Sequence, residues 1–508
     1  MLAIALANAY FYENAQCKQF AYAIWQHLKY HPLVSITCLL GIFFLSSGAL
    51  LAPGNYDSGL YHFTTIAWLN QHPITLGLGN LHGRLAFNQS YFPLPALLNV
   101  YPLWNKGYSI AGPLLIYLGI ASIAFGGLQK IRLGTYLQAA LFILLASLCT
   151  DISAPTPDLA IAVLQIVIFG ELITLLWQRQ QKEDLAPARL IAFACLCFLI
   201  CSMKLSGIAF GLSAFALLVP MYYQLHKTYP TQFFKLLYLL IAFVLIHVTR
   251  SCLLSGAPFY PMTLSTLSWV DWAIPIQTIQ SELDWTYSWA RRPGYPATEV
   301  IGNWNWFRPW LGTLSWSVLI SILLTSISLP WCLYLYLRNN TSIHSYRAPK
   351  QSLGNVGLIF LPLLIATLFW FFTAPDIRFL GVIYQLLTIF SVWLTLVMLK
   401  PSSIASSSKM SNKHSDVSAL NQQILLYGFL CAMIVLAGLQ IIRPRIFTGS
   451  EQLPVTELKT NQTLSGLVIN SPVSGEQCGN ANLPCTPYFN SALKEFRLNN
   501  WWLIYSVK

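Results

Sequence analysis

Long apolar runs separated by short polar segments are the feature of this sequence that most restricts its fold. Each run is close to the roughly 20 residues that an α-helix needs to cross about 30 Å of hydrocarbon. Only 9% of the 508 residues are charged, which is too few to cover so much apolar surface in water. We therefore predict an all-α polytopic membrane protein with about eleven transmembrane helices, at residues 33–52, 108–128, 133–150, 159–177, 189–203, 206–223, 234–253, 311–336, 355–373, 379–398 and 423–442.

Many of the basic residues lie in short connections between these runs. Short loops rich in Lys and Arg stay on the cytoplasmic side of a membrane, so the formal net charge of +12 indicates membrane topology, with no nucleic-acid partner. The rule predicts a cytoplasmic N-terminus and an external C-terminus. We predict a membrane domain at 1–442, with external loops at 53–107 and 254–310, followed by an external tail domain at 443–508.

The tail is predicted to form a small α+β or irregular cap. Residues 464–472 have strand character, and residues 490–499 are expected to form a short helix. Cys478 and Cys485 stand in a polar stretch, where a disulfide is the natural interpretation if the tail faces an oxidising compartment. A zinc site is not expected there, because no histidine or further cysteine is close enough in the sequence to complete four ligands.

The segment "NYDSGLYHFTTIAWLNQH" (55–72) follows the first apolar run directly. We predict that it begins a helix lying along the membrane surface, with Trp68 as an aromatic anchor. Charges of both signs stand at the ends of predicted spans on the same external level, although charge close to lipid costs free energy. They suggest a site for an anionic lipid headgroup, formed by Asp57, Asp158, Lys204, Arg250 and Arg378.

Several stretches resemble an uncharacterised family of bacterial polytopic membrane proteins, which is in turn similar to the GT-C membrane glycosyltransferases. They are "YDSGLYH", "GLGNLHGRLAFNQS" (77–90), "SGAPFYP" (255–261), "PDIRF" (375–379) and "QCGNANLPCTPYF" (477–489). The resemblance implies a transferase of the bacterial inner (cytoplasmic) membrane that uses a polyprenyl-phosphate-linked sugar on the external face. The acceptor would be a surface glycan, a lipid or a protein.

Asp57 occupies the place where GT-C enzymes carry the acidic residue of the first external loop, so the resemblance implies that it is catalytic, either as the base or as the residue that aligns the acceptor. The paired acidic motif of many such loops is replaced here by Asp-Ser, which leaves the use of a divalent metal open. The same stretches and boundary charges provide the expected substrate-binding residues: Tyr61, His62, His82, Arg84, Asp158, Lys204, Arg250, Tyr260 and Arg378.

This chemistry also suits the residue types. Transfer from a lipid phosphate requires a base that takes a proton from the acceptor hydroxyl, and cations that stabilise the departing phosphate. A phosphate leaving group requires no general acid, so one carboxylate suffices. Without a metal, Lys204, Arg250 and Arg378 are the expected phosphate partners, because arginine can meet phosphate oxygens with two parallel hydrogen bonds.

Each candidate residue also has a purely structural interpretation. Asp57 could cap the surface helix, and Asp158 could be a favourable charge at a helix N-terminus. Lys204 could extend its ammonium group toward the interface. The remaining residues could be loop histidines satisfied by the backbone, or arginines anchored at the membrane surface: His62, His82, Arg84, Arg250 and Arg378.

Two wider alternatives remain open at this stage. Eight of the 17 tryptophans lie in 269–316, either as an interfacial belt or as a platform for sugar rings. The chain could also be a transporter or flippase of a lipid-linked glycan, or a non-catalytic assembly subunit. The lack of an internal duplication of the kind seen in many transporters and the external charges favour the enzyme.

Overall fold

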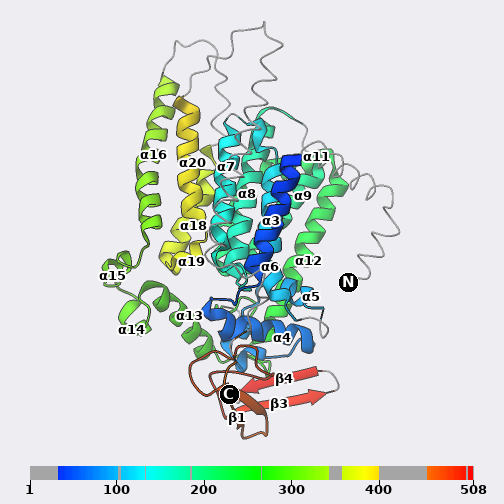
Figure 1. Cartoon of the computed structure of the whole chain (residues 1–508). Helices are drawn as coiled ribbons and strands as arrows, with labels where there is room; N and C mark the ends of the chain where they lie inside the picture. The colour runs from blue at the N-terminus through cyan, green and yellow to red at the C-terminus, as the bar shows by residue number, and fades with distance from the viewer. Residues whose placement is uncertain are drawn as a thin grey trace.

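The protein is a helical bundle with a small β-domain at one end (Figure 1). The computed structural model describes residues 32–100, 105–131, 133–183, 186–264, 266–341, 357–399, 453, 455–498 and 501–506. The bundle contains α3 (Pro32–Ala49), α6 (Gly107–Phe125), α7 (Gly134–Ser147), α8 (Pro157–Gln180), α9 (Pro187–Met203), α10 (Ile208–Leu217), α11 (Val219–Thr228), α12 (Pro230–Ser255), α16 (Trp316–Thr341), α18 (Phe360–Thr373) and α20 (Ile383–Leu399).

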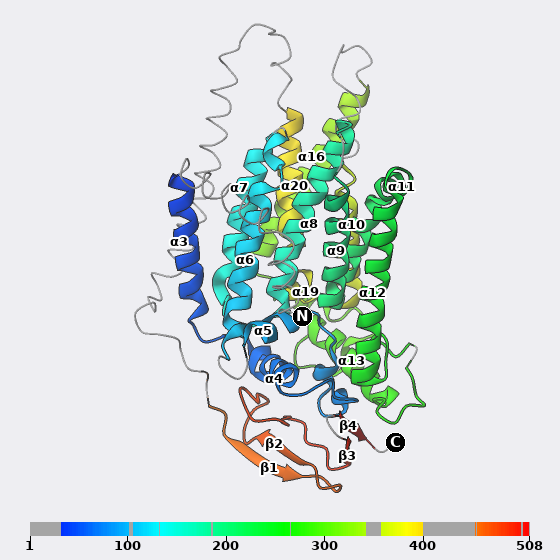
Figure 2. The same ribbon diagram turned by 90° about the vertical axis from the view of Figure 1, so that its right-hand side faces the viewer.

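Shorter elements cover the end of the bundle that faces the β-domain (Figure 2). They come mainly from the two long loops predicted at 53–107 and 254–310. These elements are the π-helical turn η1 (Ser58–His62), the 3-10 turns η2 (Leu78–Asn80) and η3 (Gly83–Ala86), and the helices α4 (Phe63–Gln71), α5 (Pro93–Leu98), α13 (Ile276–Arg291), α14 (Ala297–Val300), α15 (Phe307–Leu311) and α19 (Ile377–Leu380).

The chain is a candidate multi-pass membrane protein, but the prediction of eleven spans is not supported. Among the described residues, four helices are long and apolar enough to cross a membrane, at Gly107–Ala124, Pro157–Gln180, Pro230–Ser255 and Trp316–Leu335. The pair α10 and α11 is a fifth if its 50° bend is one broken span. The other apolar helices α7, α9, α18 and α20 have 14 to 17 residues, or about 21–26 Å of helix. The predicted span 423–442 lies outside the described residues.

The break between α10 and α11 has a local cause. Pro220 stands in the first turn of α11, where its missing N–H and rigid ring cannot continue a preceding helix. The run predicted as one span at 206–223 therefore bends near Leu218 instead of continuing straight. Apolar composition alone indicated a span here and gave no warning of the bend.

Helix α8 forms the centre of the bundle. In this helix 94% of the spanning residues are buried, and it packs against α6, α7, α9, α10 and α20. An apolar helix without a polar face is expected where neighbours surround it on all sides. Within the buried length of this helix, the polar side chain of Gln165 is only 1% exposed.

Gln165 holds the turn between α19 and α20. Its Nε2 donates to the carbonyl of Leu380 at 3.2 Å, and its Oε1 accepts from the backbone N–H of Val382 at 2.8 Å. Gly381 between them has a φ of +64°, and a Cβ there would collide with the Gln165 amide, so only glycine fits well. This buried amide therefore fixes the position of α19 relative to α8.

The tail domain consists of two antiparallel hairpins. Strand β1 (Leu458–Gln462) pairs with β2 (Val468–Pro472), and β3 (Leu493–Leu498) pairs with β4 (Trp501–Ser506). The strand predicted within 464–472 is thus confirmed, but the helix predicted at 490–499 is wrong. Pairing with the aromatic and β-branched residues of β4 outweighs the helix propensity of Leu, Lys and Glu in this segment.

The tail domain docks on the surface helix α4. Leu76 exchanges backbone hydrogen bonds with Trp502 and Ile504, both at 2.9 Å. The Trp68 ring lies 5.0 Å from the Trp502 ring, and Trp68 is only 4% exposed. The prediction that Trp68 anchors the chain in the membrane surface is therefore wrong, because the tail covers this side chain.

The two ends of the bundle differ in character (Figures 1 and 2). The end that carries the tail also carries η1, α4, α13 and α19. At the other end, Glu171 of α8 pairs with Arg189, whose Nη2 lies 2.7 Å from Glu171 Oε2. This ion pair neutralises a carboxylate that would otherwise stand alone on an apolar helix.

The orientation of the chain in a membrane remains a prediction from the basic loops. We expect a reporter fused after Lys182 to be on the cytoplasmic side, and a reporter fused after Lys508 to be on the opposite side. Alkaline phosphatase and green fluorescent protein fusions at both positions measure this. Two reporters on the same side would contradict the predicted topology.

Candidate functional site

Asp57 stands at the beginning of η1, just beyond the end of α3. Its backbone N–H donates to Asn55 Oδ1 at 2.9 Å. Although it occupies the N-cap position, its side chain makes no capping hydrogen bond. Its Oδ1 instead lies 3.2 Å from Arg84 Nη1, and its Oδ2 lies 3.6 Å from Arg378 Nη1. The capping interpretation is thus not supported, and the carboxylate is held between two guanidinium groups.

Arg84, on η3, connects Asp57 with a second carboxylate. Its Nε lies 3.8 Å from Glu282 Oε1 on α13, and its guanidinium lies 5.9 Å from the centre of the Tyr61 ring. Burial raises the pKa of Glu282, while the Arg84 charge lowers it. Arg84 is therefore shared between two acids that come from different loops.

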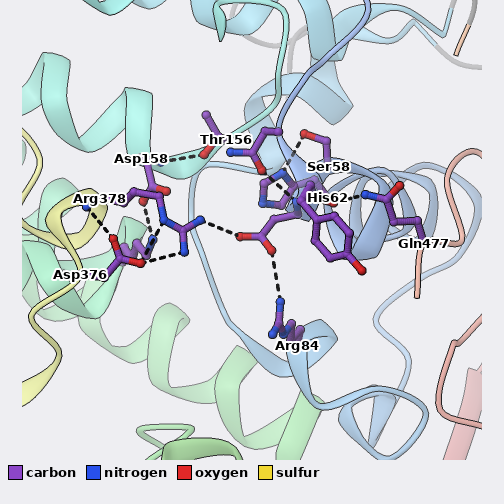
Figure 3. A network of polar contacts seen from close by, with 12 residues as sticks. Ser58, His62, Arg84, Thr156, Asp158, Asp376, Arg378 and Gln477 are labelled. Atoms are coloured by element: carbon purple, nitrogen blue, oxygen red, sulfur yellow. Dashed lines mark hydrogen bonds and ion pairs between the residues drawn. The ribbon is translucent and has the colours of Figure 1, made fainter. Parts of the chain in front are cut away.

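Arg378, on α19, is the most exposed member of the cluster, with 43% of its side chain accessible. Asp376 caps α19 and also accepts from Arg378 Nε at 3.1 Å and Nη2 at 2.9 Å. Figure 3 shows Arg378 beside Asp376 and Asp158. Burial acts to lower the pKa of Arg378, but these carboxylates and Asp57 raise it overall. The guanidinium is thus permanently charged, with Nη1 directed at Asp57.

Two tryptophans hold the backbone that precedes Arg378. The indole N–H of Trp370 donates to the carbonyl of Asp376 at 2.6 Å, and that of Trp310 donates to the carbonyl of Pro375 at 2.7 Å. Trp310 belongs to the tryptophan-rich stretch at 269–316, so one member of that stretch has a structural task beside the site. The described contacts assign no sugar-binding role to it.

Lys204 and Asp158 form an ion pair next to Arg378. Lys204 lies in the break between α9 and the 3-10 turn η6 (Leu205–Gly207), and its Nζ contacts Asp158 Oδ1 in the first turn of α8. The same ammonium lies 4.4 Å from the centre of the Phe379 ring. Both side chains are about four-fifths buried, so Lys204 points into the cluster and is not extended toward the membrane surface.

Tyr61 and His62 lie beneath Asp57 on η1. Both are buried, and Ser58 Oγ is 3.4 Å from His62 Nδ1. Burial, with the nearby charges of Lys204 and Arg84, lowers the pKa of His62 well below its usual value. Burial also raises the pKa of Tyr61. Both side chains are therefore neutral at pH 7 and form the apolar floor of the cluster.

His82 and Tyr260 lie on the Glu282 side of Arg84. The Tyr488 ring of the tail lies 5.2 Å from His82, and a Cβ on Gly83 would come within 2.9 Å of the Tyr260 hydroxyl. Burial, with a smaller effect of Arg84, lowers the pKa of His82 to about 3. Burial also raises the pKa of Tyr260. Within the described part of the chain, neither His82 Nε2 nor the Tyr260 hydroxyl has a hydrogen-bond partner.

The pKa of His82 predicts an acid-sensitive fold. Unfolded His82 takes up a proton below about pH 6.5, whereas the buried ring stays neutral down to about pH 3. Stability is thus lost as pH falls through this range, by about 2 kcal/mol between pH 7 and pH 5. We expect His82→Asn to reduce the difference between melting temperatures at these two pH values, whereas His226→Asn, at an exposed histidine, should not. Equal pH dependence in both variants would contradict this assignment.

Arg250 is not brought to Asp57. It lies on α12, and within the described residues its hydrogen bond goes to Asn88 Oδ1. Asn88 in turn donates to the carbonyl of His247 at 2.6 Å. The structure therefore brings together three of the four residues predicted for a common phosphate site, Asp57, Lys204 and Arg378. Asp158 and Arg84 join this network, and Arg250 lies outside it.

Several members of the cluster were not identified from the sequence. Asp376, two residues before Arg378, has the sequence signature of a helix cap. Glu282 lies in a tryptophan-rich stretch without any local motif. Gln477 and Tyr488 come from the tail, whose docking on α4 and η1 no local pattern predicts. No group of three or more His, Cys, Asp or Glu side chains in the described ranges is arranged to hold a metal ion.

The fold and the cluster define a class: a helical, candidate multi-pass membrane protein with interlinked acids and bases at one end of its bundle. The chain belongs to a family described as a domain of unknown function, DUF8201, whose model matches residues 1–385. That match carries no link to glycosyltransferases. No curated protein matches the chain, and neither does any solved structure.

The disulfide predicted between Cys478 and Cys485 is confirmed.

Proposed function

We propose that this protein is a membrane glycosyltransferase. It moves a sugar from a polyprenyl-phosphate donor to a glycan, lipid or protein acceptor on the external face of the bacterial inner membrane. The observation that carries the proposal is the Asp57 carboxylate, which makes no capping bond and lies between the guanidinium groups of Arg84 and Arg378. This arrangement combines a base with cations that suit a phosphate.

In the proposed reaction, Asp57 accepts the proton of an acceptor hydroxyl. The acceptor oxygen forms a bond to the anomeric carbon as the bond between that carbon and the phosphate oxygen breaks. The electron pair of the broken bond leaves with the polyprenyl phosphate, and Asp57 later releases its proton to solvent. Every step uses an acid, a base or a cation already in the cluster.

Arg378 is the proposed first contact of the donor phosphate. Asp376 occupies its Nε and Nη2, and in the part of the chain that the structure describes its Nη1 lies 3.6 Å from Asp57 Oδ2. A phosphate oxygen that takes over Nη1 would replace this contact and release one oxygen of Asp57 for the acceptor. Lys204, attached to the same cluster through Asp158, provides a second positive charge for the leaving group.

The test uses the full chain, purified into lipid nanodiscs. The protein is incubated with decaprenyl phosphate carrying a [14C]glucosyl, galactosyl or mannosyl group, together with membranes of the source cells as acceptor. Chromatography measures the release of free decaprenyl phosphate, and competition by farnesyl phosphate measures recognition of the lipid phosphate. We expect release by the wild-type protein and inhibition by farnesyl phosphate.

One outcome would contradict the proposed transferase activity, and another would contradict the proposed role of Asp57. Movement of the intact donor across the bilayer of proteoliposomes, without any release of decaprenyl phosphate, would indicate a transporter or flippase. Release that persists unchanged in Asp57→Asn would remove Asp57 from the mechanism. The glucosyl, galactosyl and mannosyl donors are compared at equal concentration, so that preference for one sugar is measured in the same experiment.

A further inference from the structure

The tail contacts the chain on both sides of Asp57. Gln477 Nε2 donates a hydrogen bond to the carbonyl of Tyr56 at 2.7 Å. The backbone N–H of Gly479 donates to the carbonyl of Gly59 at 2.8 Å. Figure 3 shows Gln477 approaching the segment from the side of the cluster opposite Arg378. Asp57 is thus bracketed by hydrogen bonds that come from residues more than 400 positions away in the sequence.

The peptide group that joins Tyr56 to Asp57 is held at both of its polar atoms. Its carbonyl accepts from Gln477, and its N–H donates to Asn55 Oδ1 at 2.9 Å. A peptide plane fixed at both ends has little freedom to rotate. The starting direction of the Asp57 side chain therefore depends on one local hydrogen bond and one hydrogen bond from the tail.

The local backbone has an unusual geometry. Ser58–His62 form a π-helical turn, a rare geometry that occurs mostly as a single turn and often at functional sites. Gly59 lies against the tail, and a Cβ there would come within 2.9 Å of Gln477 Cδ. The absence of a side chain at this position allows Gln477 to lie flat on the turn.

Gln477 stands directly before a closed loop of the tail. The next residue, Cys478, forms the disulfide with Cys485, and both cysteines are 1% exposed. Asn470 of β2 connects this loop to the first hairpin, because its N–H donates to the carbonyl of Pro484 and its carbonyl accepts from the N–H of Thr486, both at 3.0 Å. The loop is thus braced from two directions.

We propose that Gln477 is a positioning residue for Asp57, and that the segment 476–485, which includes the disulfide loop Cys478–Cys485, is a part of the active site contributed by the tail. This inference rests on the proposed function of Asp57. It assigns a task to a segment that lies outside the family match at 1–385. Gln477 acts through the backbone carbonyl of Tyr56 and does not touch the substrate.

The first test measures the backbone directly. Gln477→Met keeps the length of the side chain and removes its donor. Gln462→Met is the matched control, because Gln462 Nε2 also donates to a backbone carbonyl in the tail, that of Gly466, but far from Asp57. Hydrogen exchange with mass spectrometry follows the peptide containing 55–62. We expect exchange at least fivefold faster in Gln477→Met and unchanged in Gln462→Met.

The second test separates positioning from binding. In the decaprenyl phosphate assay, Gln477→Met should lower kcat about tenfold and leave both the donor KM and competition by farnesyl phosphate unchanged. Gln477→Lys restores a donor and should recover most of the lost kcat. A purely structural role would lower the amount of folded protein and would not produce this split.

The outcomes distinguish the inference from the proposed function. Unchanged exchange at 55–62 in Gln477→Met overturns the inference, whatever the enzyme assay shows. Faster exchange with unchanged kcat overturns it as well, because the hydrogen bond from Gln477 to the Tyr56 carbonyl would then have no effect on the activity of Asp57. A wild-type protein that releases no decaprenyl phosphate, with faster exchange in Gln477→Met, contradicts the transferase and leaves the contact between the tail and this segment supported.

Discussion

Asp57→Asn is expected to leave the protein folded and to lower the release of decaprenyl phosphate by about 10²–10⁴-fold, the usual loss when a general base is removed. Asparagine can still accept a hydrogen bond from Arg84, so the cluster keeps its shape. The amide cannot take the acceptor proton, so the chemical step is lost. Release of free decaprenyl phosphate, measured by chromatography, gives the rate, and the melting temperature in nanodiscs measures folding.

The matched control for this variant is Asp271→Asn. Asp271 is an exposed aspartate on the loop before α13, at the same end of the molecule, and should tolerate the change. A loss of activity that occurs in Asp57→Asn and not in Asp271→Asn supports the assignment of Asp57 as the catalytic base. Activity within threefold of wild type in Asp57→Asn would show that the carboxylate only balances the charges of Arg84 and Arg378.

Arg378→Gln has the second largest expected effect. Removal of a group that stabilises charge in the transition state typically costs about 10²–10³-fold in kcat, and the loss of a phosphate contact should also weaken inhibition by farnesyl phosphate about tenfold. Glutamine keeps much of the side-chain length and can still donate to Asp376. The kcat and the farnesyl phosphate inhibition constant are measured on the same preparation.

Arg308→Gln is the control for the arginine, because Arg308 is exposed on the neighbouring helix α15. It tests whether a general loss of positive charge at this end explains the result. Equal effects in both variants would mean that the phosphate responds to the overall charge of the surface. A lower kcat with an unchanged farnesyl phosphate inhibition constant would show that Arg378 does not contact the donor phosphate.

The apolar pattern predicted helices well and their lengths poorly. The runs at 159–177 and 234–253 correspond to α8 and α12, which are long enough to span. Within the run at 133–150, α7 has only 14 residues, because the 3-10 turn at Leu148–Asp151 ends it and another 3-10 turn, at Leu128–Lys130, precedes the run. Hydropathy measures how apolar a segment is, and does not register where hydrogen bonding changes from one helix type to another.

The site was predictable in part for a related reason. Four members of the cluster stand at or next to a helix terminus: Asp57, Asp158, Lys204 and Arg378. Their common position relative to the membrane, predicted from the apolar runs, was therefore enough to group them. Arg250 stands at a similar level on α12 but contacts Asn88, because level along a helix does not determine which neighbour a side chain faces. Glu282 and Gln477 reach the cluster only through contacts between distant segments, which local patterns do not contain.

The Gln165 amide has a consequence for how the cluster can move. Asp158 belongs to α8 through the chain, and Arg378 is tied to α8 because Gln165 holds the turn after α19. Asp158 and Arg378 are therefore both positioned by α8. Asp57 is fastened instead to the tail through Gln477 and Gly479. The 3.6 Å contact between Asp57 and Arg378 consequently joins a residue positioned by α8 to a residue positioned in part by the tail, and a displacement of the tail is expected to lengthen that contact.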